Sequence, residues 1–143
     1  MHMETHGAGD RRCIAFHGWG GDHREFAAVA AHRPPGVRID SVDLPGCGAS
    51  PAPPAWSLDG IIHSLAEALG PFHGVTLAGY CSGAVFAMRL AHQRPAEVRR
   101  LVLIDPFAYV PWYFRIFLAG TPGRRAYGAA AWRTRRHCNS RPG

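Results

Sequence analysis

The chain has 143 residues, 47% of them hydrophobic, which is enough for one core and too little for two ordinary domains. Its formal charge of +6 comes from 16 basic residues, all of them arginine, and ten acidic ones. Residues 1–105 contain nine arginines and ten acidic residues, whereas residues 106–143 contain seven arginines and no acidic residue. The net positive charge therefore comes from the tail, and it predicts no nucleic-acid partner for the rest of the chain.

Short apolar runs alternate with helical patterns along the chain up to Asp105. Asp22, with Glu25 three residues later, predicts the start of a helix that Pro34 closes, and Ser57 predicts the cap of a second helix. A third helical pattern covers residues 83–93. The apolar runs between these patterns are typical of buried strands and lie at 13–16, 37–42, 75–78 and 101–104.

Strands separated by helices of about ten residues predict an α/β fold, with one parallel sheet and helices on both faces. The ligand site of such a sheet lies beyond the carboxyl ends of its strands. All four predicted strands end in residues of chemical interest, namely HGWGG, DLPG, GYCSG and DP. The pattern therefore predicts a functional site at this edge of the sheet.

The third strand runs into a segment that fits a nucleophile elbow, a sharp strand-to-helix turn that exposes its central residue. Its sequence is Gly79-Tyr80-Cys81-Ser82-Gly83. The two glycines are needed because strand and helix approach too closely there for side chains. Cys81 takes the central place and is the predicted nucleophile, while Ser82 would contribute its backbone N–H.

Together these motifs resemble the α/β-hydrolase family. The matching pieces are HGWGG (17–21), DLPGCGAS (43–50), GYCSG (79–83) and LVLIDP (101–106), and their order and placement at strand ends make the joint match specific. The resemblance covers about residues 11 to 120 and implies a truncated α/β-hydrolase core of about four strands. It also implies that the backbone N–H groups of Trp19 and Ser82 form the oxyanion hole.

Cysteine at the elbow is similar to the minority of relatives that use a thiol, such as dienelactone hydrolases and polyhydroxyalkanoate synthases. A helix N-terminus stabilises the thiolate form of such a residue. In the family an acid and then a histidine follow the nucleophile, and Asp105 fits the acid. The later histidines are His92, inside a helix, and His137, in the arginine-rich tail, and neither fits the base. By the resemblance, the chain is the front half of a hydrolase.

Two other residues at strand ends have simpler interpretations. His17 is expected to hold the oxyanion loop rather than to act as a base. Asp43, ahead of Leu-Pro-Gly, is expected to form a turn. The chain as a whole is expected to divide into a disordered N-terminus (1–10), the hydrolase core (11–106), a partial lid or cap (107–132) and a disordered arginine-rich tail (133–143).

Three functions stay open at this point. The favoured one is hydrolysis of an ester or thioester through a Cys81 acyl-enzyme, and the second is an acyltransferase similar to polyhydroxyalkanoate synthases; both take a small-molecule acyl substrate. The third is a catalytically inactive fragment or interaction module. In that case the strand 101–104 would be an unpaired apolar edge, through which we expect self-association.

Several kinds of partner are not expected. No apolar run approaches the roughly 18 residues of a membrane span, and the first residues, MHMETHGAGDRR, lack the apolar centre of a secretion signal. The four cysteines form no CxxC pair and show no zinc-like spacing with histidine. We therefore expect a cytoplasmic protein with no membrane partner, no cofactor and no metal ligands.

Overall fold

The computed structural model describes residues 1–106, and the predicted lid (107–132), the tail (133–143) and His137 lie outside them. Five strands form one sheet in the order β1-β3-β2-β4-β5. Strands β2 to β5 run parallel, which confirms the predicted parallel sheet. The strands are β1 (Met3–His6), β2 (Arg11–Phe16), β3 (Val37–Val42), β4 (Val75–Tyr80) and β5 (Val98–Ile104). The helical segments are η1 (His23–Phe26), α1 (Ala27–Ala31), α2 (Leu58–Leu69) and α3 (Ser82–Gln93).

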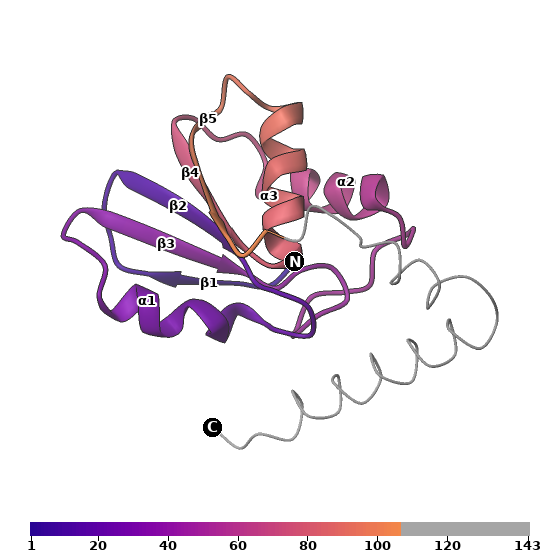
Figure 1. Ribbon diagram of the computed structural model, residues 1–143, viewed down its shortest axis with the longest axis horizontal. Helices are drawn as coiled ribbons and strands as arrows, with labels where there is room; N and C mark the ends of the chain where they lie inside the picture. Colours follow the sequence, from indigo (N-terminus) through magenta and orange to yellow (C-terminus); the bar gives the residue numbers. More distant parts are fainter. Residues whose placement is uncertain (107–143) are drawn as a thin grey trace, which may run out of the picture.

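Helices cover both faces of the sheet, with α1 on one face and α2 and α3 on the other (Figure 1). Because side chains alternate along a strand, β2 supplies both layers. Ile14 and Phe16 enter the larger core with the apolar residues of α2 and α3, while Ala15 joins Phe26 and Ala30 in the smaller core beneath α1. The central strands of the sheet are therefore buried between two helical layers, and the strand ends are left to form the site.

The helix starts follow the predicted capping chemistry only in part. Ser57 caps α2, its hydroxyl accepting a hydrogen bond from the Gly60 N–H at 3.1 Å, as predicted. Asp22 caps η1 by accepting from the Arg24 N–H at 2.9 Å. Glu25, however, does not close a capping box onto Asp22, because its carboxylate turns back to the loop that follows β2. The position of Glu25 is therefore set by a contact seven residues away.

The first ten residues, expected to be disordered, instead contribute an edge strand. Met3–His6 form β1, which pairs antiparallel with β3 from Met3 opposite Val42 to His6 opposite Ile39. The expectation was wrong because METH shows no apolar alternation, which is the usual sequence signal of a strand. This strand is mostly exposed and is held by the edge of β3 rather than by a buried face.

The opposite edge of the sheet is formed by β5. Its four consecutive apolar residues, 101–104, are all exposed in the described part of the chain. An exposed apolar edge strand is a site where another strand can pair. Self-association through this edge stays a prediction. Within residues 1–106, no helix has the length and apolarity needed to cross a bilayer.

Deleting residues 1–6 should destabilise the fold, because β3 would lose its edge partner. The loss includes the hydrogen bond from the Asp43 N–H to the His2 carbonyl at 3.0 Å as well as the β1–β3 pairing. Each such bond contributes about 0.5–1.5 kcal/mol net, so the free energy of unfolding should fall by at least about 2 kcal/mol. Urea unfolding of the full chain and the deletion variant measures this, and equal midpoints would mean that the segment is disordered after all.

Candidate active site

The turn between β4 and α3 has the geometry of a nucleophile elbow. Cys81 lies between the last residue of β4, Tyr80, and the first of α3, Ser82, with φ 52° and ψ −115°. This left-handed conformation is rare for a residue with a side chain and persists only where the surroundings enforce it. The Cys81 side chain makes no capping hydrogen bond to the helix and is half-buried.

Two glycines enforce the turn by allowing close approach. A Cβ at Gly79 would lie 2.5 Å from the backbone of Gly83 and Ala84 in the first turn of α3. A Cβ at Gly83 would collide with the carbonyl oxygens of Phe16 and His17, at the end of β2. The structure therefore agrees with the steric reason for the two elbow glycines, and it adds that the start of α3 rests on the neighbouring strand.

The HGWGG loop (residues 17–21), which follows β2, is fixed by hydrogen bonds at both of its ends. The Gly21 N–H donates to the Gly18 carbonyl at 3.2 Å, closing a tight turn in which Gly20 has φ 69°. The Gly18 N–H in turn donates to the Glu25 carboxylate at 2.7 Å. Gly18 also packs closely against Cys81, since a Cβ at Gly18 would lie 3.3 Å from the Cys81 Cβ. The loop therefore borders the elbow.

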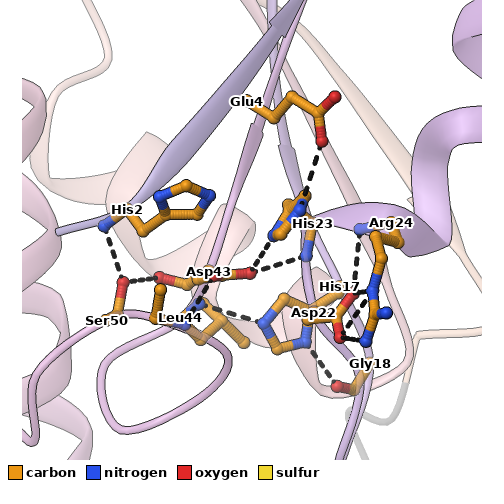
Figure 2. Close-up of polar contacts among 11 residues, drawn as sticks. His2, Glu4, His17, Gly18, Asp22, His23, Arg24, Asp43, Leu44 and Ser50 are labelled. Carbon is orange, nitrogen blue, oxygen red and sulfur yellow. Dashed lines mark hydrogen bonds and ion pairs between the residues drawn. The ribbon is translucent and has the colours of Figure 1, made fainter. Parts of the chain in front are cut away.

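His17, the first residue of this loop, is fully buried and holds the loop in place. Its Nε2 accepts a hydrogen bond from the Leu44 N–H at 3.0 Å, so its Nδ1 must carry the proton that it donates to the Gly18 carbonyl at 2.8 Å (Figure 2). Burial lowers the pKa of His17, although the Gly18 carbonyl and nearby carboxylates oppose this effect. Because both nitrogens are engaged by backbone groups, His17 serves as a neutral bridge between two loops.

Asp43 organises the loop that follows β3. Its buried carboxylate accepts from the His23 N–H at 2.7 Å and from His23 Nδ1 at 2.8 Å (Figure 2). It also accepts from the Ala49 N–H at 2.9 Å. Burial alone would raise the pKa of Asp43, but the hydrogen bonds from Ala49 and His23 outweigh it and hold the pKa below its ordinary value. This supports the turn-forming role expected for Asp43.

Asp105 follows β5 at the same edge of the sheet as Cys81. The Cys81 N–H donates to the carbonyl of Ile104 at 2.9 Å, which joins the two strand ends directly. Asp105 is exposed and has φ 47°. Its position beside the elbow is compatible with the acid role, and that role stays a prediction.

The described residues do not supply a base to Cys81. No hydrogen bond within residues 1–106 joins a histidine to its sulfur, and both His17 nitrogens are bound elsewhere. His92 is exposed in the last turn of α3, about 15 Å along the helix from Ser82 at 1.5 Å per residue. The prediction that His92 does not act on Cys81 therefore agrees with the structure.

The other two cysteines among the described residues belong to packed regions. Cys13 packs against the smaller core, and burial with the nearby Asp40 carboxylate raises its pKa to about 11. Cys47 packs against the larger core. Neither lies at the turn that Cys81 occupies. Among the described cysteines, Cys81 therefore differs from the other two by its position at the elbow.

A sequence model of the alpha/beta hydrolase fold matches residues 14–140. The chain belongs to this family. Lipase LipV of Mycobacterium tuberculosis is 35% identical over 112 residues, which cover 74% of this chain and 41% of the lipase. Pimeloyl-(acyl-carrier protein) methyl ester esterase of Legionella pneumophila is 33% identical over 104 residues, covering 73% of this chain and 41% of the esterase.

Solved structures agree with this α/β-hydrolase fold. A thermophilic esterase from Thermogutta terrifontis superimposes with a TM-score of 0.66 over 77% of this chain and 42% of its own, at 22% identity, a similarity of fold alone. The chain spans about two fifths of the length of the curated relatives it matches.

Sequence reasoning missed two features near the α/β-hydrolase elbow. The contact of Glu25 with the HGWGG loop was hidden because the same residue fits a capping box. The approach of His2 and His23 to Asp43 was hidden because His2 enters through an edge strand that the pattern does not predict. Both depend on which segments the sheet brings together.

The lowered pKa of His17 predicts a pH-dependent stability. As the pH falls through the ordinary value of 6.5, the unfolded chain binds a proton before the folded chain does. His17 therefore contributes stability that is present above pH 6.5 and lost below it, by at most about 1.4 kcal/mol per pH unit. Urea unfolding at pH 7.5, 6.5 and 5.5 should show this slope in the wild type and a smaller one in His17→Gln.

The matched control for this experiment is His63→Gln, because His63 is exposed on α2. It should keep the slope of the wild type. If His17→Gln also kept that slope, His17 would not be the neutral buried group that the hydrogen bonds indicate.

Proposed function

We propose that the protein containing this chain hydrolyses carboxylic esters or thioesters through an acyl-enzyme formed on Cys81. The observation that carries the proposal is the strained turn at Cys81, with φ 52°, between β4 and α3. Such strained residues cluster at functional sites, and this turn places the half-buried Cys81 side chain at the carboxyl end of the sheet. The esterase and lipase among the relatives favour oxygen esters as the substrate class.

The first step of the proposed reaction is attack of the Cys81 sulfur, as thiolate, on the carbonyl carbon of the ester. As the C–S bond forms, the bond from the carbonyl carbon to the alcohol oxygen breaks. The alkoxide leaves and takes a proton from the solvent, which gives a thioester on Cys81. Water then attacks the same carbon, releasing the carboxylic acid and returning the thiol. Each stage passes through a tetrahedral intermediate whose oxygen carries negative charge.

Two backbone N–H groups near Cys81 are suited to stabilise that oxygen. Ser82 lies in the first turn of α3, where N–H groups have no partner within the helix and the helix dipole favours negative charge. Trp19 lies in the HGWGG loop, which borders Cys81 through Gly18. We assign the oxyanion hole to the N–H groups of Trp19 and Ser82 on this arrangement.

The base is the part of the mechanism that residues 1–106 do not provide. His17 is occupied on both nitrogens, and Asp105 can orient a histidine only if one is brought to it. Acylation by an activated ester needs little help from a base, because the leaving group departs as an anion. Deacylation needs a water molecule that is activated by a base. We therefore expect deacylation to be the slow stage for this chain alone.

A p-nitrophenyl ester tests the proposal directly. The full chain should release up to one equivalent of p-nitrophenolate in a burst, followed by slow turnover, and Cys81→Ala should show no burst. Mass spectrometry should find the acyl group on the Cys81 peptide. Equal release by the wild type and Cys81→Ala would remove Cys81 from the mechanism.

The matched control is Cys47→Ala, which removes a thiol that packs against the larger core instead of the one at the elbow. It should keep the burst of the wild type. A persistent acyl-Cys81 that is discharged by an added thiol acceptor but not by water would favour the acyltransferase alternative over hydrolysis.

A further inference from the structure

Three side chains that are distant in sequence converge beside the loops of the candidate active site. They are His2, which precedes β1, His23, at the start of η1, and Asp43, which directly follows β3 (Figure 2). One potential ligand atom from each lies within 4.8 Å of the other two. Their convergence depends on the pairing of the edge strand β1, so the spacing of these residues in the sequence does not predict it.

The backbones that carry these side chains are fixed to one another. The His2 N–H donates to the Ser50 hydroxyl at 2.9 Å, and the His2 carbonyl accepts from the Asp43 N–H at 3.0 Å. The His23 N–H donates to the Asp43 carboxylate at 2.7 Å. The Ser50 hydroxyl closes the set by donating to the Asp43 carbonyl at 2.7 Å. The backbones of the three residues are therefore held together before any ligand arrives.

The ring of His23 lies between two carboxylates. Its Nδ1 is 2.8 Å from Asp43 Oδ1, and its Nε2 is 3.2 Å from Glu4 Oε2. Metal-bound histidines commonly donate their second ring nitrogen to a carboxylate, which orients the ring and strengthens the ligand. Glu4 is placed for that task if Nδ1 binds an ion. The His2 ring stands edge-on to His23, with centroids 4.8 Å apart.

We propose that His2, His23 and Asp43 bind one divalent transition-metal ion, with Zn²⁺ the best match. Two imidazole nitrogens and one carboxylate oxygen are a donor set that Zn²⁺ accepts, whereas Ca²⁺ and Mg²⁺ take oxygen ligands. The ion replaces the proton between His23 Nδ1 and Asp43 Oδ1, and water completes the tetrahedron.

The fit requires only small movements. Ligands at about 2.0–2.1 Å from a tetrahedral zinc lie roughly 3.3 Å apart. The contact of His23 Nδ1 with Asp43 Oδ1 at 2.8 Å must open by about half an ångström, which the proton's departure permits. The widest separation, at most 4.8 Å, must close by about 1.5 Å, which a turn of the His2 ring can supply.

The consequence of binding is structural. The ion ties the N-terminal residues to η1 and to the end of β3, and η1 begins two residues after the HGWGG loop. It therefore restrains one side of the site without touching Cys81. This inference is independent of the proposed hydrolase activity, since it rests on different side chains and is measured by binding.

Isothermal titration of Zn²⁺ into the metal-free full chain tests the site. We expect one ion per chain for the wild type, and at least tenfold weaker binding for His2→Gln and for His23→Gln. Glu4→Gln should bind about ten- to a hundredfold more weakly, because it removes only the carboxylate behind His23. The control His63→Gln, on the exposed surface of α2, should match the wild type.

Cobalt provides a second readout that does not depend on affinity. Co²⁺ bound to the wild type should give visible absorption bands of a tetrahedral nitrogen and oxygen site, and these bands should be absent from His2→Gln. Retained binding in both histidine variants, thiolate-to-cobalt bands, or no Zn²⁺ binding by the wild type would each overturn the proposal. In the last case the cluster would serve only to hold the His23 ring between the carboxylates of Asp43 and Glu4.

Discussion

The structure depends on one close contact, the approach of the first turn of α3 to the end of β2. Gly83 touches the carbonyl oxygens of Phe16 and His17 so closely that no Cβ fits between them. This contact fixes where α3 begins, and the backbone of Cys81 must then make a left-handed turn to join β4 to it. The same contact brings the HGWGG loop to the elbow, so one steric constraint sets both the nucleophile position and the loop beside it.

Buried polar groups extend this constraint through the neighbouring loops. His17 joins the Gly18 carbonyl to the Leu44 N–H, and Asp43 joins η1 to the loop after β3. Each of these side chains satisfies backbone groups that a loop would otherwise leave unpaired. The candidate site is therefore organised by residues that do not take part in the proposed chemistry. The proposed metal site, if occupied, would add a further tie to the same network.

Much of the sheet and the elbow could be predicted because their signals are local. Apolar runs, the Ser57 cap and the glycines around Cys81 each act over a few residues, and the structure has the corresponding strands, cap and turn. The β1 strand could not be predicted, because its pairing is provided by β3 and not by its own apolar pattern. The contact of Glu25 could not be predicted either, because its carboxylate accepts a hydrogen bond from the Gly18 N–H instead of capping the start of its own helix.

The central claim is that the Cys81 sulfur is presented at the turn as a reactive group. Peptide-resolved mass spectrometry of the folded chain treated with iodoacetamide at pH 8 measures this for each thiol. Cys81 should be alkylated faster than Cys13, because burial and the nearby Asp40 carboxylate raise the pKa of Cys13 to about 11 and leave it little thiolate. Equal rates for the two thiols, or a Cys81 that reacts only after unfolding in urea, would contradict the account.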